Sequence, residues 1–282
     1  MWRARRAGSV TPLERHAVAT PPAEGGLVLV DKPAGPSSFA VVRGVRRRFG
    51  AKAGHAGTLD PFATGLLLCL VGRSTRLARY LVGLDKRYMT EIRLGLRTTT
   101  GDGEGQLREK TPIATRADVE ALEGEILLRI PQASAVKIEG ERAYALHRRG
   151  VVVDMPVRRS TVHALEIVRY EPPLVELRLH VSSGTYVRAI ADELGGHCRT
   201  LRRTAVGPFR VDDADQHRLL PPLAALVHLP ERELSDEEAA AIRSGRPLDG
   251  EGEGPVALWT RGALVAVGRA DRGVIRPETV VT

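Results

Sequence analysis

Short apolar runs that suit strands are mixed with short amphipathic helical segments along this chain, without a repeating strand–helix–strand unit. Strand-like runs occur at residues 26–30, 66–71 and 88–94, and residues 185–194 have the spacing of an amphipathic helix. A regular βαβ repeat would build a parallel sheet covered by helices, whereas an irregular mixture is typical of other mixed folds. The sequence therefore predicts an α+β fold around a mostly antiparallel sheet.

Further elements follow from periodicity and from capping residues. Ser37 or Ser38 can cap a helix that ends at Gly50 and that we expect to turn Phe39 inward. The remaining predicted helices are residues 74–82, 117–125, 143–149 and 234–244, and the remaining predicted strands are residues 151–157, 161–170, 174–182, 256–259, 263–268 and 274–276.

Changes in composition divide the 282 residues into three parts. Residues 1–25 are rich in Pro, Ala and Arg, lack the apolar core of a secretory signal, and predict a disordered basic tail. Prolines around residues 221–230 mark a second change, so we expect a large domain at 26–228 and a small β domain at 229–282. No apolar run approaches the roughly 18 residues of a membrane span, so we expect no membrane association and a cytoplasmic location.

The charge of the chain favours a polyanionic partner. The formal net charge is +8, and only five of the 42 basic residues are lysines. Guanidinium groups bind phosphates in a bidentate manner and stack on bases, although the base composition of a genome can also enrich arginine. Clustering therefore carries the inference, against the alternative of a merely solvated basic surface. The four clusters are Arg43 with Arg46, Arg47 and Arg48, then Arg148 with Arg149, Arg158 with Arg159, and Arg199 with Arg202 and Arg203.

Metal chemistry is not expected. Cys69 and Cys198 are too few for a disulfide framework or a metal cluster. Cys69 lies in an apolar run, which predicts a buried thiol.

One acidic residue, Asp60, lies in the glycine- and proline-rich loop "GHAGTLDPFATG" of residues 54–65. Pro61 keeps Asp60 extended, and Gly57 and Gly65 permit close approach of the backbone. A rigid carboxylate presented on a loop suits nucleophilic catalysis. An Asp-Pro turn with a structural role explains the same spacing, and the loop alone leaves both interpretations open.

The extended string "GHAGTLDPFATGLL" resembles the catalytic loop of the TruB family of tRNA pseudouridine synthases. Five other blocks are similar to that family and occur in its order: "GLVLVDKPAGPSS" (26–38), "KRYMTEIRLGLRTTTGDGEG" (86–105), "SAVKIEGERAYALHRRG" (134–150), "VSSGTYVRAIADELG" (181–195) and "LRRTAVGPF" (201–209). The resemblance implies a catalytic pseudouridine synthase domain followed by a small PUA-like RNA-binding domain. It also implies isomerisation of a uridine in the T-loop arm of tRNA, without a cofactor.

The resemblance assigns the central residues of the site. Asp60 matches the catalytic aspartate, which would either attack C1′ of the ribose or assist departure of the uracil. Arg188 matches its basic partner, and an exposed charge on a helix is the alternative. Tyr88 matches the aromatic that faces the flipped-out uracil, and packing within its strand is the alternative.

Further residues are assigned to binding. Tyr186 and Leu201 match pocket positions and could equally be core residues. His55 would help to hold the nucleotide or would order the loop, and Lys32 would support the site or contact a phosphate, with solvent exposure as its alternative. RNA binding is expected of Arg142, Arg148, Arg149, Arg202 and Arg203, with solvated surface charge as the alternative for those near residues 139–150.

Two positions depart from the family pattern, since Ala56 replaces a common threonine and Ala133 a common tyrosine. Two other functions compete with the tRNA-modifying enzyme. One is an RNA-binding or RNA-folding protein on the same scaffold, against which Asp60, Tyr88 and Arg188 speak. The other is a guide-RNA-dependent synthase that works with protein partners, whereas the short C-terminal part favours action without an obligate protein partner. The sequence has no long apolar heptad or exposed apolar stripe, so we expect a monomer.

Overall fold

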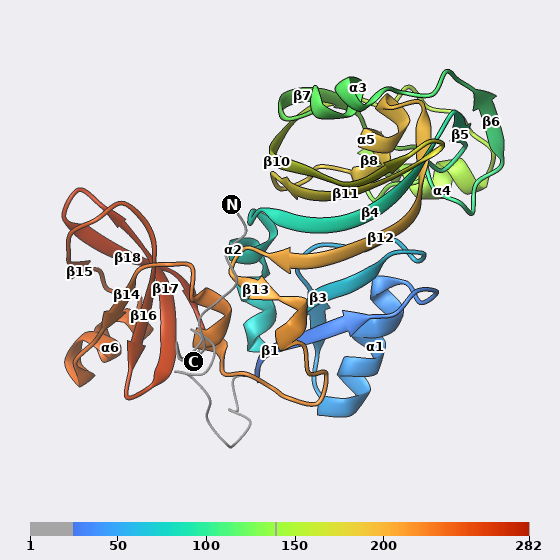
Figure 1. Ribbon diagram of the computed structural model, residues 1–282. Helices are drawn as coiled ribbons and strands as arrows, with labels where there is room; N and C mark the ends of the chain where they lie inside the picture. Colours follow the sequence, from blue (N-terminus) through green and yellow to red (C-terminus); the bar gives the residue numbers. More distant parts are fainter. Residues whose placement is uncertain (1–24, 139, 282) are drawn as a thin grey trace.

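The computed structural model describes residues 25–138 and 140–281. Its main body is a nine-stranded sheet in which β12 pairs with β3 in parallel and every other pair is antiparallel. The strand order is β1-β3-β12-β4-β11-β10-β7, with β2 beside β3 and β13 beside β12 (Figure 1). The mostly antiparallel α+β fold is confirmed. The strands are β1 (Gly25–Lys32), β2 (Ala53–His55), β3 (Thr64–Gly72), β4 (Lys86–Leu94), β7 (Gly124–Arg129), β10 (Val157–Glu171), β11 (Leu174–Val181), β12 (Gly196–Val206) and β13 (Phe209–Arg210).

Strands β1 and β3 are buried on both faces, which explains their uninterrupted apolar sequences. Alternate residues Leu27, Leu29, Leu66, Leu68 and Leu70 face one core, while Val28, Val30, Leu67, Cys69 and Val71 face a second core beneath α1 (Ser38–Phe49). A third core lies between β4, β11 and α5 (Val187–Glu193). Both faces of the sheet are therefore covered at β3, the strand that follows the loop carrying Asp60.

Helix α1 has the predicted bounds but not the predicted face. Ser37 caps it by accepting a hydrogen bond from Ala40 N, and Gly50 ends it with φ of +63°. Phe39 is 66% exposed and lies near Arg43, one turn further on. The buried stripe starts at Ser38 instead, so the inward position of Phe39 was the wrong prediction.

The other helices are short. They are α2 (Ala78–Val82), which follows a 3₁₀ turn at Arg73–Leu77, then α3 (Arg116–Glu120) and α4 (Ala143–Arg148). The helix predicted over 117–125 ends early because Gly124 begins β7. Residues 151–156, predicted as strand, form no strand.

Strand β12 was missed by the periodicity, although it lies in the middle of the sheet. The run Arg199–Arg203 contains three arginines and one threonine, which break the apolar pattern of a central strand. The fold compensates by burying one of these arginines, Arg203, which is 1% exposed.

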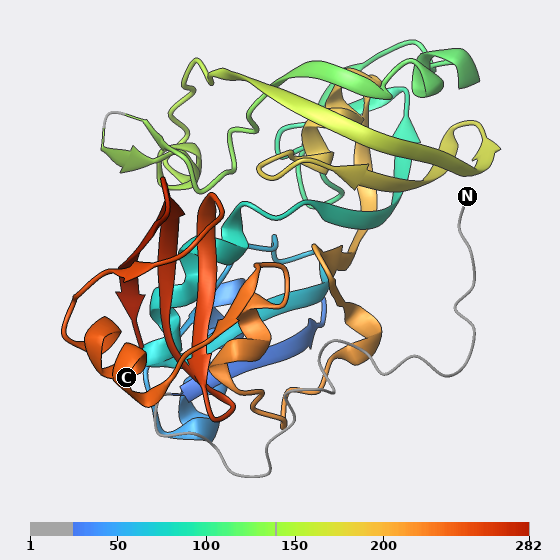
Figure 2. The same ribbon diagram turned by 90° about the vertical axis from the view of Figure 1, so that its left-hand side faces the viewer.

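The C-terminal part forms a second, five-stranded sheet in the order β14-β16-β17-β18-β15. Its elements are β14 (Glu231–Glu233), α6 (Asp236–Arg243), β15 (Leu248–Asp249), β16 (Gly254–Thr260), β17 (Ala263–Asp271) and β18 (Val274–Val280). Two small hairpins, β5 (Leu96–Thr98) with β6 (Leu107–Lys110) and β8 (Lys137–Ile138) with β9 (Glu141–Arg142), extend from the main body. Figure 2 shows the C-terminal sheet standing beside the main body.

The two sheets share a core. Ala257, Leu264 and Val267 of the second sheet pack with Leu223 and Leu226 of the 3₁₀ turn Pro222–Leu226, in the same cluster as the face of β1 and β3. No helix within residues 25–138 and 140–281 is long and apolar enough to cross a membrane. The tail predicted over residues 1–25 lies outside the described residues except for Gly25, which begins β1.

Candidate active site

The loop between β2 and β3 presents Asp60, and its backbone is fixed from α1. Ser38 Oγ accepts a hydrogen bond from Leu59 N and donates one to Leu59 O, both at 2.8 Å. Near the end of the loop Gly65 has φ of +102°, and a Cβ there would lie 2.2 Å from Arg203 O. Only glycine permits this approach to β12, so sequence and packing together fix the position of Asp60.

Lys32 supports the same loop from below. Its side chain is fully buried, and Nζ donates hydrogen bonds to Pro33 O at 2.8 Å, Pro36 O at 2.9 Å and Pro61 O at 3.1 Å. Burial lowers the pKa of Lys32, and the Asp60 carboxylate opposes that shift. All three ammonium hydrogens have acceptors. The predicted support of the site therefore agrees with the structure, whereas substrate contact and solvent exposure do not fit a fully buried ammonium whose donors are all used.

Arg203 acts in the same way from β12. Its Nε donates to Leu66 O at 2.7 Å, and the two terminal nitrogens donate to Thr58 O at 3.2 Å and Gly57 O at 3.1 Å. A guanidinium that is 1% exposed cannot reach RNA. The prediction of an RNA contact is wrong for Arg203, because alternation along β12 turns it inward. Its neighbour Arg202 is partly exposed and pairs with Asp31 at 2.7 Å.

Asp60 and Arg188 form a bidentate ion pair. Arg188 Nε lies 2.8 Å from Asp60 Oδ2, and Nη2 lies 3.1 Å from Oδ1. The Arg188 side chain is 2% exposed, which excludes an exposed charge on a helix, whereas the Asp60 side chain is 30% exposed. Two fixed donors orient the carboxylate without closing it off from solvent.

Arg188 also joins two distant segments to this pair. Its Nη1 donates to Thr100 O at 2.5 Å, and its Nη2 donates to Ala133 O at 2.8 Å. The Thr100 loop follows β5, and Ala133 precedes the β8–β9 hairpin. The guanidinium thus holds three loops together, and at Ala133 it uses a backbone carbonyl that is indifferent to the side chain.

A cavity of about 450 Å³ opens beside the ion pair. Its size is in the range of small-molecule sites. Six residues singled out from the sequence meet in it, namely His55, Asp60, Tyr88, Tyr186, Arg188 and Leu201. Tyr88 from β4 and Leu201 from β12 are 8% and 6% exposed, so packing and cavity lining are combined in both. The fold thus brings these six residues, which lie far apart in the sequence, to one cavity.

Polar atoms without partners lie in this cavity wall. His55 Nδ1 and Ser134 Oγ are both buried and have no hydrogen-bond partner among the described residues. Burial, with Arg203 nearby, lowers the pKa of His55, so its imidazole is neutral at pH 7. Burial raises the pKa of Tyr186, and the charge of Arg188 opposes that shift. Most buried polar groups in proteins are paired, so these two atoms set this part of the wall apart from the rest of the interior.

Lys86 is a cavity residue that the sequence reasoning missed. Its Nζ donates to Val82 O at 2.7 Å and to Ser183 Oγ at 3.0 Å, and burial lowers its pKa to about 8. The signal was present, because Lys86 has the same parity along β4 as Tyr88 and lies on the same buried face.

The arginines expected to grip RNA lie around α4. Arg142 donates to Ala135 O at 3.2 Å, Arg148 donates to Tyr144 Oη at 2.7 Å, and Arg149 pairs with Glu141. All three are exposed. Their hydrogen bonds stay on the surface, so they do not enter the cavity.

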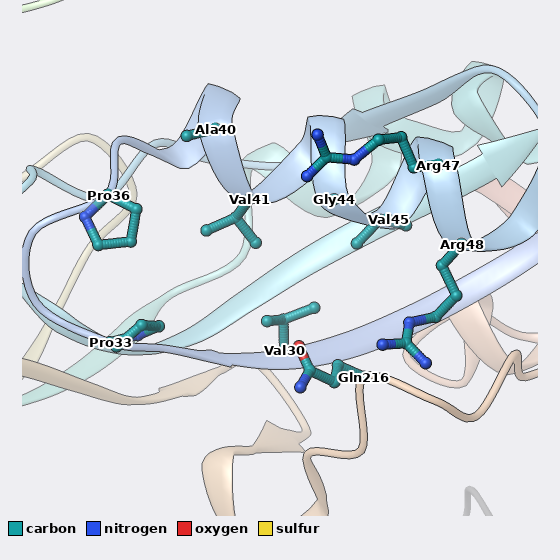
Figure 3. A pocket seen from close by; sticks show the side chains of 10 residues that line it. All are labelled: Val30, Pro33, Pro36, Ala40, Val41, Gly44, Val45, Arg47, Arg48 and Gln216. Atoms are coloured by element: carbon teal, nitrogen blue, oxygen red, sulfur yellow. The ribbon is translucent and has the colours of Figure 1, made fainter.

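A larger hollow of about 660 Å³ lies between α1 and Gln216 (Figure 3). It is lined by apolar residues such as Val30 and Val41, with Arg47 and Arg48 at its edge. It contains no carboxylate or hydroxyl, so chemistry rather than size identifies the active site. Within the described residues no group of three or more His, Cys, Asp and Glu could hold a metal ion.

Known proteins with similar sequences decide the family. Residues 46–187 match the TruB family pseudouridylate synthase N-terminal domain. The chain is 38% identical to tRNA pseudouridine synthase B of Aromatoleum aromaticum, covering 91% of this chain and 92% of the relative. It is 41% identical to tRNA pseudouridine synthase B of Thermobifida fusca, covering 90% and 98%. The chain belongs to the TruB family of pseudouridylate synthases.

Solved structures share the fold of this TruB family member. The archaeal box H/ACA sRNP Nop10–Cbf5 complex contains a chain 25% identical to it, with a TM-score of 0.65 over 92% of this chain and 86% of that chain. An H/ACA RNP bound to a substrate RNA containing 2′-deoxyuridine contains a chain with a TM-score of 0.69 and 23% identity, covering 99% and 92%.

Proposed function

We propose that this protein isomerises a uridine in the T-loop arm of tRNA to pseudouridine, with Asp60 as the catalytic residue. The observation that carries the proposal is the bidentate Asp60–Arg188 pair, with its carboxylate 30% exposed at a cavity lined by Tyr88 and Tyr186. A family of pseudouridylate synthases supplies the reaction class. The relatives named tRNA pseudouridine synthase B supply the tRNA substrate.

The reaction exchanges one bond for another. The bond between C1′ and N1 of the nucleoside breaks, the uracil turns while it is held, and a bond forms between C1′ and C5. The hydrogen on C5 is lost as a proton, and N1 gains one, so the formula is unchanged and no cofactor is needed. Asp60 either attacks C1′, as the nucleophile of a retaining glycosidase does, or assists departure of the uracil.

The cavity walls suit a base that has left its stack. Extrusion of a nucleotide costs a few kcal/mol, and stacking on an aromatic ring offsets about 1–3 kcal/mol of this. We assign that stacking to Tyr88, with Tyr186 and Leu201 completing the wall and His55 contacting the extruded nucleotide. The place of His55 in the cavity wall and its neutral imidazole support this contact.

RNA outside the cavity would contact the basic surface. We assign Arg142, Arg148, Arg149 and Arg202 to the RNA backbone, because all four are at least partly exposed. We treat residues 26–228 as the catalytic domain and residues 229–282 as a PUA-like RNA-binding domain, supported by the separate five-stranded sheet. We expect a monomer that works in the cytoplasm.

The test uses a bare T-arm hairpin without guide RNA or protein partner. Incubation with the protein should yield one pseudouridine, detected by carbodiimide labelling and primer extension. Binding without any modified uridine would instead support an RNA-binding protein that has lost catalysis. Modification that appears only after a guide RNA is added would support a guide-dependent enzyme.

A further inference from the structure

Arg158 lies next to the cavity and has no role in the reaction as described. It is exposed, near the start of β10, and pairs across the sheet with Leu128 of β7. Along β10 it shares its face with Ser160 and Val162, which are 3% and 1% exposed. Arg158 therefore projects on the face that bears the core and α5, whereas Arg159 projects on the other face.

The guanidinium of Arg158 lies over Gly184, which lines the cavity. Arg158 Nη1 is 2.5 Å from the position that a Cβ of residue 184 would occupy. The loop beneath is rigid, because Ser183 Oγ donates to Val82 O at 2.6 Å and Ser182 Oγ accepts from Thr161 N at 2.9 Å. The Arg158 guanidinium thus lies directly against the Gly184 wall of the cavity.

Arg158 differs from the other cations around this cavity. Arg188, Lys86 and Arg203 each donate to carboxylate, carbonyl or hydroxyl oxygens of the protein. Within residues 25–138 and 140–281, Arg158 has neither a hydrogen bond nor an ion pair. Its charge acts on the cavity, since Arg158 lowers the pKa of Tyr186 in opposition to burial.

An unpaired guanidinium beside the cavity suits one group of the substrate in particular. A nucleotide that enters the cavity remains joined to the RNA by a phosphate on either side, and a cation beside the cavity can bind one of these anions. Arginine binds phosphate oxygens through two parallel hydrogen bonds, which fixes position as well as charge.

We propose that Arg158 binds a phosphate adjoining the target nucleotide and thereby holds the RNA with its target uridine at the cavity. The inference rests on the proposed function, because it takes the RNA substrate as given. Arg158 is a positioning residue, since it contacts the RNA backbone and not the atoms that react.

The experiment compares Arg158→Gln with the matched control Arg159→Gln. Arg159 is the next residue on the same strand, but it faces away and pairs with Glu125 at 2.7 Å. Substrates are an unmodified T-arm hairpin and two hairpins with a neutral methylphosphonate at one or the other phosphate flanking the target uridine. Pseudouridine formation gives kcat and KM, and filter binding gives Kd at several salt concentrations.

Arg158→Gln should raise KM and Kd for the unmodified hairpin about tenfold, with kcat nearly unchanged. The slope of log Kd against log salt should fall by about one. One of the two methylphosphonate hairpins should abolish the difference between wild type and Arg158→Gln, and Arg159→Gln should match wild type throughout.

Equal effects of Arg158→Gln and Arg159→Gln would overturn the inference. So would a loss in Arg158→Gln that persists on both methylphosphonate hairpins, because the arginine would then act on something other than those phosphates. If wild type binds RNA but forms no pseudouridine, the proposed function fails, and the binding data still decide the role of Arg158.

Discussion

Two buried cations, Lys32 and Arg203, hold the loop of Asp60 in place, and a third, Lys86, donates to carbonyl groups of Val82 and Leu84. Lys32, Lys86 and Arg203 all lie within the protein, and most of their donors go to backbone carbonyl groups. Lysine and arginine are rarely buried without a partner, so solvent exposure was the natural expectation for Lys32. The carbonyl groups of a tight loop are partners that a sequence does not reveal. Parity along a strand does reveal part of the pattern, as it does for Lys86 with Tyr88.

Lys86 should make stability depend on pH. Its pKa is about 8 in the folded protein and near 10.5 when it is unfolded, so between these values the unfolded chain binds more protons. The free energy of unfolding contributed by Lys86 therefore rises with pH from about 8 to 10. Screening limits this gain to about 1–2 kcal/mol.

Urea unfolding at pH 7, 8, 9 and 10 of wild type and Lys86→Met measures this effect. Loss of the Lys86 hydrogen bonds lowers the free energy of unfolding of the variant by the same amount at every pH. The contributions of the other titrating groups are common to both proteins and cancel when the two free energies are subtracted. The difference between the two proteins should therefore grow in favour of wild type above pH 8. A difference that is flat with pH would show that Lys86 titrates normally.

At the level of elements, the first turn of α1 and the loop of Asp60 are one unit. Ser37 and Ser38 are adjacent and both hydroxyl groups bond to backbone, yet only Ser38 contacts Leu59. The helix and its capping residues were predictable from local sequence, whereas the contact with Leu59 spans 21 residues and depends on packing.

This pair gives a matched test of loop positioning. Ser38→Ala leaves Leu59 N and O without partners, which should cost about 1–3 kcal/mol of stability. It should also lower kcat about tenfold or more with little change in KM, because small displacements of a catalytic group are costly.

Ser37→Ala removes only the helix cap, which should cost about 1 kcal/mol and leave kcat unchanged. Thermal unfolding and steady-state kinetics on the T-arm hairpin measure both variants. Similar kcat values for the two would show that Leu59 does not need Ser38 to place Asp60.

Other elements depended on tertiary structure. Strand β12 was not predicted, because its arginines obscure the alternation of apolar and polar residues that marks a strand. Its central place in the sheet comes from pairing with β3 and β4, which the sequence alone does not reveal. The site was found more completely than the sheet. Its residues belong to distinctive blocks around Asp60 and Arg188, which resemblance to a family identifies without knowledge of the strand order.

At the level of the whole molecule, the two sheets should unfold together. The shared core joins Leu223 and Leu226 to Ala257, Leu264 and Val267, and Tyr80 Oη lies 2.9 Å from Thr279 Oγ1 across the same boundary. A change in composition near residue 230 indicated a boundary in the sequence, but composition does not report how much core crosses it.

Calorimetry of the full chain should show a single cooperative transition. A chain that ends at residue 228 exposes the two leucines, each worth about 1.5–3 kcal/mol when buried, and its midpoint should fall by several degrees. Two separate transitions in the full chain, or an unchanged midpoint for the shortened chain, would mean that the sheets are energetically independent.

The central claim is that Asp60, held by Arg188, carries out the chemistry in the cavity. Asp60→Asn keeps the size of the side chain and removes its charge, so it measures that claim directly. The variant should bind the T-arm hairpin with a Kd within about threefold of wild type, yet form pseudouridine at least about 10³-fold more slowly. Pseudouridine formation by Asp60→Asn at the wild-type rate would contradict the account.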